Sequence, residues 1–310
     1  MVDAVGAAVV GKQDQVRLVL CGILAGAHVL IEDNPGLGKT LLARSFAQVL
    51  GLEFRRVQFT PDLLPADVTG SFVYDQRRAE FEFRPGPVFA GLLLADEINR
   101  TPPKTQAALL EAMQERQVTV EGRTFPLPDP FCVIATANPI EFEGTYQLPE
   151  AQLDGFMLRV GLGYPSEAEE VDVLQRRVAR RHEAMTLPAL TDAAGVLALQ
   201  QVVESITVES SVADYCVQLA AATRTHQQVL VGASPRGSLA LLLLARAYAL
   251  VDGRDFVTPE DVKAVAVPAL AHRITLQPEL WLRGVSAGGL VQAMLDAVPT
   301  PAPADRRLGP

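Results

Sequence analysis

An apolar run that passes through a glycine-containing turn into a helix is the sequence feature that most constrains this fold. Residues 29–31 are Val-Leu-Ile, and residues 34–40 are Asn-Pro-Gly-Leu-Gly-Lys-Thr. Gly36 and Gly38 allow the backbone to bend until successive N–H groups point at one centre. The helix that follows directs the positive end of its dipole at the same centre. This stretch therefore predicts a phosphate-binding loop between a buried strand and a helix.

The side chains that follow the turn suit a nucleoside triphosphate. Lys39 would place its charge on the β- and γ-phosphates, and the hydroxyl of Thr40 can ligate Mg²⁺. The strict loop pattern begins with a glycine, whereas this chain has Asp33 at that place. A glycine-rich helix start followed by Lys-Thr by coincidence is the alternative. The predicted nucleotide contacts are Asn34, Pro35, Gly36, Leu37, Gly38, Lys39, Thr40 and Leu41.

A second motif decides between these alternatives. Residues 92–95 are Leu-Leu-Leu-Ala, which indicates a strand buried on both faces, and Asp96 and Glu97 follow it. In an open parallel sheet, ligands bind outside the carboxyl ends of the strands. Asp96 is predicted to hold Mg²⁺ directly or through water, and Glu97 to polarise an attacking water. Solvated acids at a strand end are the alternative, but beside Lys39 and Thr40 a triphosphate-hydrolysing core is the simpler interpretation.

Bulk composition excludes several other classes. The 310 residues carry a formal charge of −9, which argues against non-specific nucleic-acid binding. Three scattered cysteines, each in an apolar stretch, are expected to be reduced core residues of a cytoplasmic protein. We expect no secretion signal and no membrane span, because the longest apolar run, residues 239–251, is short and contains Arg246. The cysteines are Cys21, Cys132 and Cys216.

Alternation of strands and helices predicts an α/β fold with a doubly wound parallel sheet. After Pro165 the strand signals stop, so we expect a nucleotide-binding core over residues 1–165, an all-α lid domain over 166–298, and a disordered tail over 299–310. The expected strands are 29–31, 56–59, 92–95, 131–135 and 158–162; the expected helices are 13–26, 40–50, 103–116, 166–180, 193–205, 211–225, 238–250 and 259–271.

Two hairpins are expected to interrupt this alternation. Residues 79–84 alternate strictly between apolar and charged side chains and would pair with 72–74. Residues 117–120 would pair with 124–127 across a Glu-Gly-Arg turn. The two interpretations are decoration of a sheet edge or protruding elements that contact a partner or substrate.

Six segments make the chain resemble the MoxR family of AAA+ ATPases over about residues 9–274. They are Phe-Thr-Pro-Asp-Leu-Leu-Pro at 59–65, Glu-Phe-Arg-Pro-Gly-Pro-Val-Phe at 82–89, Leu-Ala-Asp-Glu-Ile-Asn-Arg at 94–100, Pro-Pro-Lys-Thr-Gln at 102–106, Gln-Leu-Pro-Glu-Ala-Gln-Leu-Asp at 147–154 and Ala-Ser-Pro-Arg at 233–236. The resemblance implies a P-loop core with a helical lid and a ring-forming ATPase, hexameric, with ATP and Mg²⁺ bound between protomers.

The resemblance also implies roles for single residues. Asn138 matches sensor 1, which would orient the attacking water, and Arg236 matches sensor 2 on a lid helix, which would reach the γ-phosphate. Taken alone, these two residues also fit an ordinary turn and a surface cation. Val10 and Gly11 match the segment beside adenine.

The hairpins resemble the helix-2 insert and the presensor-1 hairpin of the family. Phe81 and Phe83 share one face of the first hairpin. These two rings would either grip a client protein or pack on the core.

One departure limits the mechanism. Many relatives carry an arginine finger where this chain has Gly155, and such a finger contributes about 10³–10⁵ in rate. Arg159 would replace it if the segment between them is helical, or Arg84 or Arg100 would serve. Otherwise hydrolysis is slow and assembly does not accelerate it.

Three functions follow from these features. The leading hypothesis is a chaperone-like motor that remodels or matures a client protein, with a partner containing a von Willebrand factor A domain implied by the resemblance. The second is a nucleotide-gated scaffold with weak hydrolysis, and the third is a helicase-like or chelatase-like motor. The dispersed histidines are expected to be structural or surface residues: His28, His182, His226 and His272.

Overall fold

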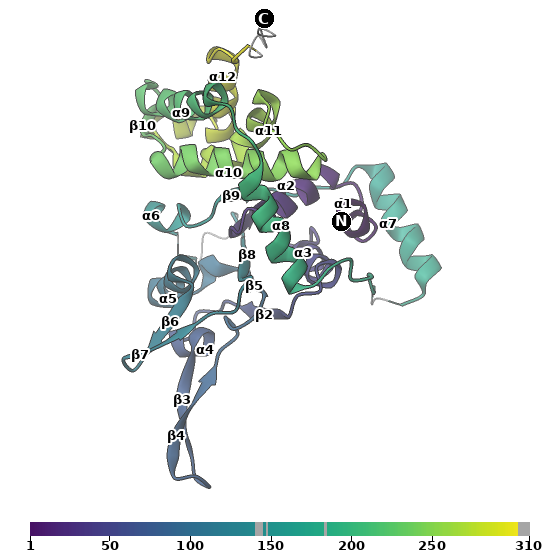
Figure 1. Cartoon of the computed structure of the whole chain (residues 1–310), viewed down its shortest axis with the longest axis vertical. Helices are drawn as coiled ribbons and strands as arrows, with labels where there is room; N and C mark the ends of the chain where they lie inside the picture. Colours follow the sequence, from purple (N-terminus) through teal and green to yellow (C-terminus); the bar gives the residue numbers. More distant parts are fainter. Residues whose placement is uncertain (140–144, 147, 183–184, 303–310) are drawn as a thin grey trace, which may run out of the picture. The chain divides into compact units, whose positions relative to one another are not determined.

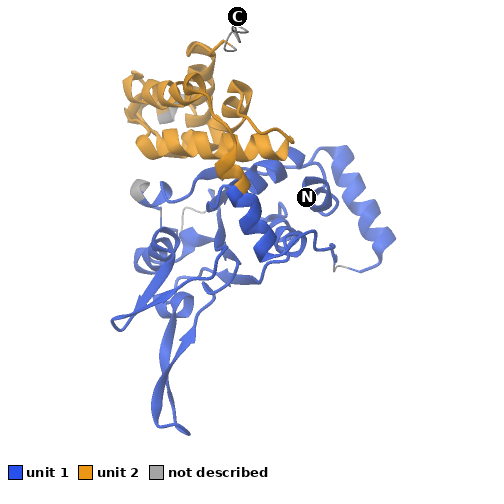
Figure 2. Cartoon of the chain, viewed as in Figure 1, with its two compact units in different colours: residues 1–201 blue, residues 202–310 orange. Residues whose placement is uncertain are grey.

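The computed structural model describes residues 1–139, 145–146, 148–182 and 185–302 (Figure 1). The chain divides into two compact units, Met1–Gln201 and Val202–Pro310 (Figure 2). The first unit contains the predicted phosphate loop and acidic pair, and the second contains the helices expected over residues 211–271. Among the described residues, no helix is both long enough and apolar enough to cross a membrane.

A five-stranded parallel sheet forms the centre of the first unit, as the sequence predicts. Its strand order is β2-β5-β8-β1-β9. Because β8 pairs with both β1 and β5, the carboxyl ends of these three strands lie next to one another. The five strands are β1 (Val29–Glu32), β2 (Phe54–Gln58), β5 (Leu92–Asp96), β8 (Cys132–Ala137) and β9 (Leu158–Val160).

Helices cover both faces of this sheet (Figure 1). Leu30, Leu93 and Val133 share one face and pack into a buried cluster with α5 (Pro103–Glu115). The neighbouring residues of each strand point the other way, and there Val29 and Leu158 lie against α2 (Gln13–Leu24). The helix α3 (Lys39–Val49) starts from the phosphate loop and also contacts the sheet. The first unit further contains α1 (Val2–Gly6), α4 (Pro65–Thr69), α6 (Glu150–Leu153) and α7 (Glu167–Arg180).

Both predicted hairpins are present, and an aromatic contact joins them. They are formed by β3 (Gly70–Asp75) with β4 (Glu80–Pro85), and by β6 (Gln117–Val120) with β7 (Arg123–Pro126). Phe83 stacks on Phe125 with ring centroids 3.9 Å apart. Phe81 is 67% exposed, and its ring contacts Tyr74 near the end of the longer hairpin, which projects beyond the sheet (Figure 1). The two rings on one face therefore differ, since Phe83 packs and Phe81 is presented to solvent.

The second unit is helical, with one short exception. Its helices are α9 (Ser210–Thr225), α10 (Pro235–Val251), α11 (Pro259–Leu270) and α12 (Ala287–Ala297). The prediction that strands stop after Pro165 is wrong here, because β10 (Val229–Val231) pairs antiparallel with β11 (Thr275–Leu276). The ladder brings together two segments more than 40 residues apart, which local patterns do not reveal, and α12 was not predicted. Ser234, Thr258 and Ser286 cap α10, α11 and α12 through their hydroxyl oxygens.

The division between the units lies further along the chain than the expected boundary at Pro165. The helix α8 (Ala193–Ser205) spans the division after Gln201. Hydrogen bonds tie the chain before this division to α2 and α3. Leu187 N–H donates to Gln48 Oε1, the Gln48 amide to Met185 O, Leu190 N–H to Val49 O, and the Gln200 amide to Ile23 O. The linker after β9 thus packs on α2 and α3.

Candidate nucleotide site

The phosphate loop has the backbone conformation that its glycines predict. Gly36 and Gly38 have φ angles of 83° and 85°, in the left-handed region that favours glycine. Gly38 is the N-cap of α3, and no described side chain caps this helix end. The first N–H groups of α3 are therefore available to an anion, together with the dipole of the helix.

Asp33 explains its own departure from the glycine pattern. Its carboxylate accepts hydrogen bonds from Asn34 N–H at 2.8 Å and from Gly163 N–H at 2.5 Å. Its N–H donates to Ala137 O at 3.2 Å. Its carbonyl accepts from Lys39 Nζ at 2.6 Å. The Asp33 side chain thus ties the start of the loop to the segment after β9, which a glycine could not do, and the backbone N–H joins the loop to the end of β8.

The acidic pair stands at the carboxyl end of β5, with Asp96 as its last residue, and is linked to β8 by one hydroxyl group. Thr136 Oγ1 donates to Asp96 Oδ1 at 2.6 Å and accepts from Glu97 N–H at 2.8 Å. Glu97 has a φ of 58°, an uncommon conformation for a residue other than glycine that occurs mostly where the surroundings enforce it. Because Asp96 ends β5 and Glu97 turns away from the strand, their carboxylates point in different directions.

Basic and amide side chains contact both carboxylates. Arg56 donates through Nε and Nη2 to Asp96 Oδ2, at 3.1 and 2.7 Å. Gln58 Nε2 donates to Glu97 Oε2 at 2.5 Å, and Arg100 Nη1 lies 3.2 Å from the same oxygen. Sequence reasoning assigned no role to Arg56, Gln58 or Thr136. The available signal was the spacing of Arg56 and Gln58 two residues apart within the expected strand 56–59, which places both side chains on one face of the sheet.

Asn138 lies directly after β8 and is 4% exposed. Asn99 fixes the backbone there, since its Nδ2 donates to Asn138 O at 3.1 Å and its Oδ1 accepts from Asn138 N–H at 3.4 Å. Lys39 Nζ lies 3.4 Å from the carbonyl of Ala137, the preceding residue. The phosphate loop, the acidic pair and Asn138 therefore meet at one edge of the sheet, although their roles stay predictions.

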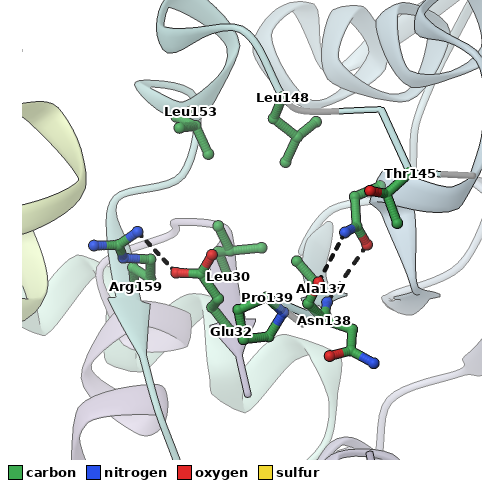
Figure 3. Close-up of a pocket in the computed structure, with 10 residues that line it drawn as sticks. Leu30, Glu32, Ala137, Asn138, Pro139, Thr145, Leu148, Leu153 and Arg159 are labelled. Atoms are coloured by element: carbon green, nitrogen blue, oxygen red, sulfur yellow. Dashed lines mark hydrogen bonds and ion pairs between the residues drawn. The ribbon is translucent and has the colours of Figure 1, made fainter. Parts of the chain in front are cut away.

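A pocket of about 280 Å³ lies beside Asn138 (Figure 3). Its lining includes Leu30, which belongs to the sheet face that α5 covers, and an ion pair between Arg159 and Glu32 with the two atoms 2.8 Å apart. Asp96 and Thr136 alternate with the residues of that face and so point to the other side of the sheet. Leu30 and the ion pair therefore lie on the face of the sheet opposite to the one on which Arg56 and Asp96 meet, and Asn138 lines the pocket at the carboxyl edge.

The expectation that Arg159 replaces the finger requires a helix between Gly155 and Arg159, and the structure has none there. The helix α6 ends at Leu153, and Arg159 lies in β9, paired with β1. Its guanidinium binds Glu32 of the same chain. Strand geometry and this ion pair both direct Arg159 to its own protomer. Part of the Gln-Leu-Pro-Glu motif, Gln147, lies outside the described residues.

The remaining predicted residues lie further from the loop in sequence. Val10 and Gly11 form the turn between α1 and α2, and Gly11 has a φ of 72°. A Cβ at Gly11 would overlap the Glu169 carboxylate, so close packing gives this glycine a structural reason. Arg236 is exposed in the first turn of α10, in the second unit, and its N–H donates to Ser234 Oγ at 3.2 Å. Its role toward a phosphate stays a prediction.

The donor set fits a nucleotide with Mg²⁺. Asp96 and Thr40 carry the kind of oxygen atom that ligates Mg²⁺, and Mg²⁺ in such sites is typically held by one or two carboxylates and by the phosphates. Among the described residues, no group of three or more His, Cys, Asp or Glu side chains is placed to hold a metal alone. Bound Mg²⁺ would supply charge neutralisation at the β- and γ-phosphates.

Comparison with known proteins agrees with this geometry. Residues 28–158 match the family model described as ATPase family associated with various cellular activities (AAA), and residues 221–292 match the AAA lid domain. Chaperone MoxR1 of Mycobacterium tuberculosis is 44% identical, over 94% of this chain and 79% of its own length. The protein YeaC of Bacillus subtilis is 48% identical over 97% of this chain and 93% of its own length.

A solved structure extends the agreement to the fold. A candidate ATPase from Cytophaga hutchinsonii superposes with a TM-score of 0.89 at 41% identity and covers 97% of this chain and 93% of its own. The matched lid model and the parallel sheet fit the same architecture. The chain therefore belongs to the MoxR family of AAA+ ATPases.

Proposed function

We propose that this ATPase binds ATP with Mg²⁺ in the loop from Asn34 to Leu41 and uses its hydrolysis to remodel or mature a client protein. The observation that supports it most is the hydroxyl of Thr136, which joins Asp96 and Glu97 to β8 beside the phosphate loop. This hydroxyl ties the Asp96 carboxylate and the Glu97 backbone N–H to β8, the strand that Asn138 directly follows.

Each residue then has a defined task. Lys39 neutralises the β- and γ-phosphates, Thr40 and Asp96 hold Mg²⁺, and Glu97 orients and polarises the attacking water. Asn138 helps to orient that water. Gln58 and Arg100 fix the Glu97 carboxylate through a shared oxygen.

Assembly belongs to the same proposal. AAA+ membership supports an oligomer, and we propose a hexameric ring in which Arg236 reaches the γ-phosphate and Val10 and Gly11 lie beside adenine. The chain would act in the cytoplasm on a protein client, together with a partner that carries a von Willebrand factor A domain. The name of the mycobacterial relative, a chaperone, and the exposed ring of Phe81 support a protein client.

A second candidate is a nucleotide-gated scaffold that hydrolyses slowly. Gly155 favours it, and so does the pairing of Arg159 with Glu32 in the same chain. Arg100 is similarly engaged by Glu97, whereas Arg84 is exposed on β4. The presence of Glu97 favours the motor.

Steady-state ATPase activity as a function of protein concentration separates the two candidates. The proteins are wild type, Glu97→Gln and Gly155→Arg, with Gly155→Ala as the steric control. A Cβ at Gly155 would lie 3.1 Å from Gln152 O and 3.4 Å from Gln114 Nε2, so a side chain fits after a small shift.

A specific rate that rises with concentration and disappears in Glu97→Gln supports an assembled motor. A low, flat rate that Gly155→Arg raises and Gly155→Ala does not supports the scaffold. A wild-type rate that Glu97→Gln leaves unchanged would contradict the assigned role of Glu97.

A further inference from the structure

Asp96, the predicted Mg²⁺ ligand, already has a cationic partner within its own chain. Arg56 lies in β2 opposite Leu94 of β5, so its side chain emerges on the same face as Asp96. Both Nε and Nη2 donate to Asp96 Oδ2, at 3.1 and 2.7 Å. Charge-assisted contacts of this length are the strong class of protein hydrogen bonds.

The other oxygen of Asp96 is engaged as well. It accepts from Thr136 Oγ1 at 2.6 Å, and the Asp96 side chain is only 10% exposed. A nearly buried carboxylate needs a compensating positive charge. The guanidinium provides that charge at the oxygen that does not contact Thr136.

The Arg56 guanidinium lies where it can move away from the Asp96 carboxylate. The Arg56 side chain is 48% exposed, and β2 is one of the two edge strands of the sheet. Nη2 also donates to Gln58 Oε1 at 2.9 Å, a second contact that remains within reach when Asp96 is released. The Thr136 bond, in contrast, lies between two adjacent strands of the sheet and is buried.

We propose that Arg56 is a displaceable counter-cation that competes with Mg²⁺ for Asp96. This inference rests on the proposed function, since it assigns a regulatory residue to the same site. The guanidinium compensates Asp96 while the metal position is empty and moves aside when Mg²⁺ enters with the nucleotide. It thereby raises the Mg²⁺ concentration at which the metal strengthens nucleotide binding.

The test measures binding, not turnover. The affinity of the full chain for the fluorescent analogue mant-ADP is measured in EDTA and at Mg²⁺ concentrations up to the millimolar range. The Mg²⁺ concentration that produces half of the change in affinity, called the Mg²⁺ midpoint, is compared between proteins. Arg56→Gln should lower this concentration about tenfold, which corresponds to about 1.4 kcal/mol. Arg56→Lys, which keeps the charge but cannot make the two-nitrogen contact, should lie between the two.

Arg55 supplies the matched control. It is the neighbouring arginine of β2, points to the opposite face, and pairs with Glu53 at 2.9 Å, with both side chains more than half exposed. Arg55→Gln should leave the Mg²⁺ midpoint at the wild-type value. Circular dichroism of each variant checks folding, and the Lys variant keeps the test decisive if Arg56→Gln does not fold.

Two results would overturn the inference alone. One is an unchanged Mg²⁺ midpoint in Arg56→Gln and Arg56→Lys. The other is a higher midpoint, which would mean that Arg56 positions Asp96 for the metal. Wild-type protein that fails to bind mant-ADP at any Mg²⁺ concentration would instead overturn the proposed function, and this inference with it.

Discussion

His28 should make the first unit sensitive to mild acid. Its ring is 5% exposed, accepts a hydrogen bond from Val133 N–H at Nδ1 over 3.0 Å, and lies 3.1 Å from Met113 O through Nε2. Because Nδ1 must accept, the neutral ring carries its proton on Nε2 and donates to Met113. Protonation would place a second N–H against the Val133 donor.

Burial lowers the pKa of His28 from 6.5 to about 4; the charge of Arg116 acts in the same direction, and the hydrogen bond to Met113 opposes it. Between these two values the unfolded chain binds a proton that the folded chain does not. The free energy of unfolding therefore falls as the pH falls through this window. A difference of about 2.5 in pKa limits the loss to roughly 3 kcal/mol, with about 2 kcal/mol already lost at pH 5.

Urea denaturation at pH 7.5, 6.5, 5.5 and 5.0, followed by circular dichroism, measures this loss. His28→Gln should be less stable than wild type at pH 7.5 but should lose about 2 kcal/mol less between pH 7.5 and 5. His182→Gln, at an exposed histidine, is the control and should retain the wild-type slope. Equal slopes for wild type and His28→Gln would refute the reasoning.

Two further substitutions test carboxylates that hold loops in place. Asp33→Gly restores the glycine of the strict pattern but loses the hydrogen bond from Gly163 N–H. We therefore expect weaker mant-ADP binding and a free energy of unfolding about 1–2 kcal/mol lower. Tighter mant-ADP binding in a titration would contradict the role of Asp33. Asp261→Ala removes the buried carboxylate that Arg254 binds but leaves it Asp252, and should cost about 1.5–3 kcal/mol in urea denaturation. Glu260→Ala, next to it and exposed, should cost under about 1 kcal/mol, and equal costs for these two would count against the buried pair.

Much of the fold followed from local patterns. The five core strands, both hairpins and the long helices lie within a few residues of their expected bounds, because apolar periodicity and glycine turns are properties of short segments. The short β10–β11 ladder was missed for the opposite reason. Its strands of three and two residues have no period of their own, and only the fold of the second unit pairs them.

The candidate site shows the same contrast. Gly36 and Gly38 indicate the loop, because a left-handed backbone there favours glycine. Asp96 and Glu97 indicate the end of a buried strand. The contact of Arg56 with Asp96 spans 40 residues of sequence. It exists because β2 pairs with β5 in register, and the sequence of neither strand shows which strand will be its neighbour in the sheet.

The sequence by itself indicated the chemistry of this chain, through a predicted phosphate loop and two acidic residues at a strand end. It also indicated the family. Tertiary structure alone decided which side chains hold those acids and in which direction each points. It placed β8 between β1 and β5, so that the Thr136 hydroxyl joins the Asp96 carboxylate to the Glu97 N–H, and it turned Arg159 toward Glu32. The physical reason is that motifs depend on local backbone geometry, whereas strand order and register depend on how the whole core packs.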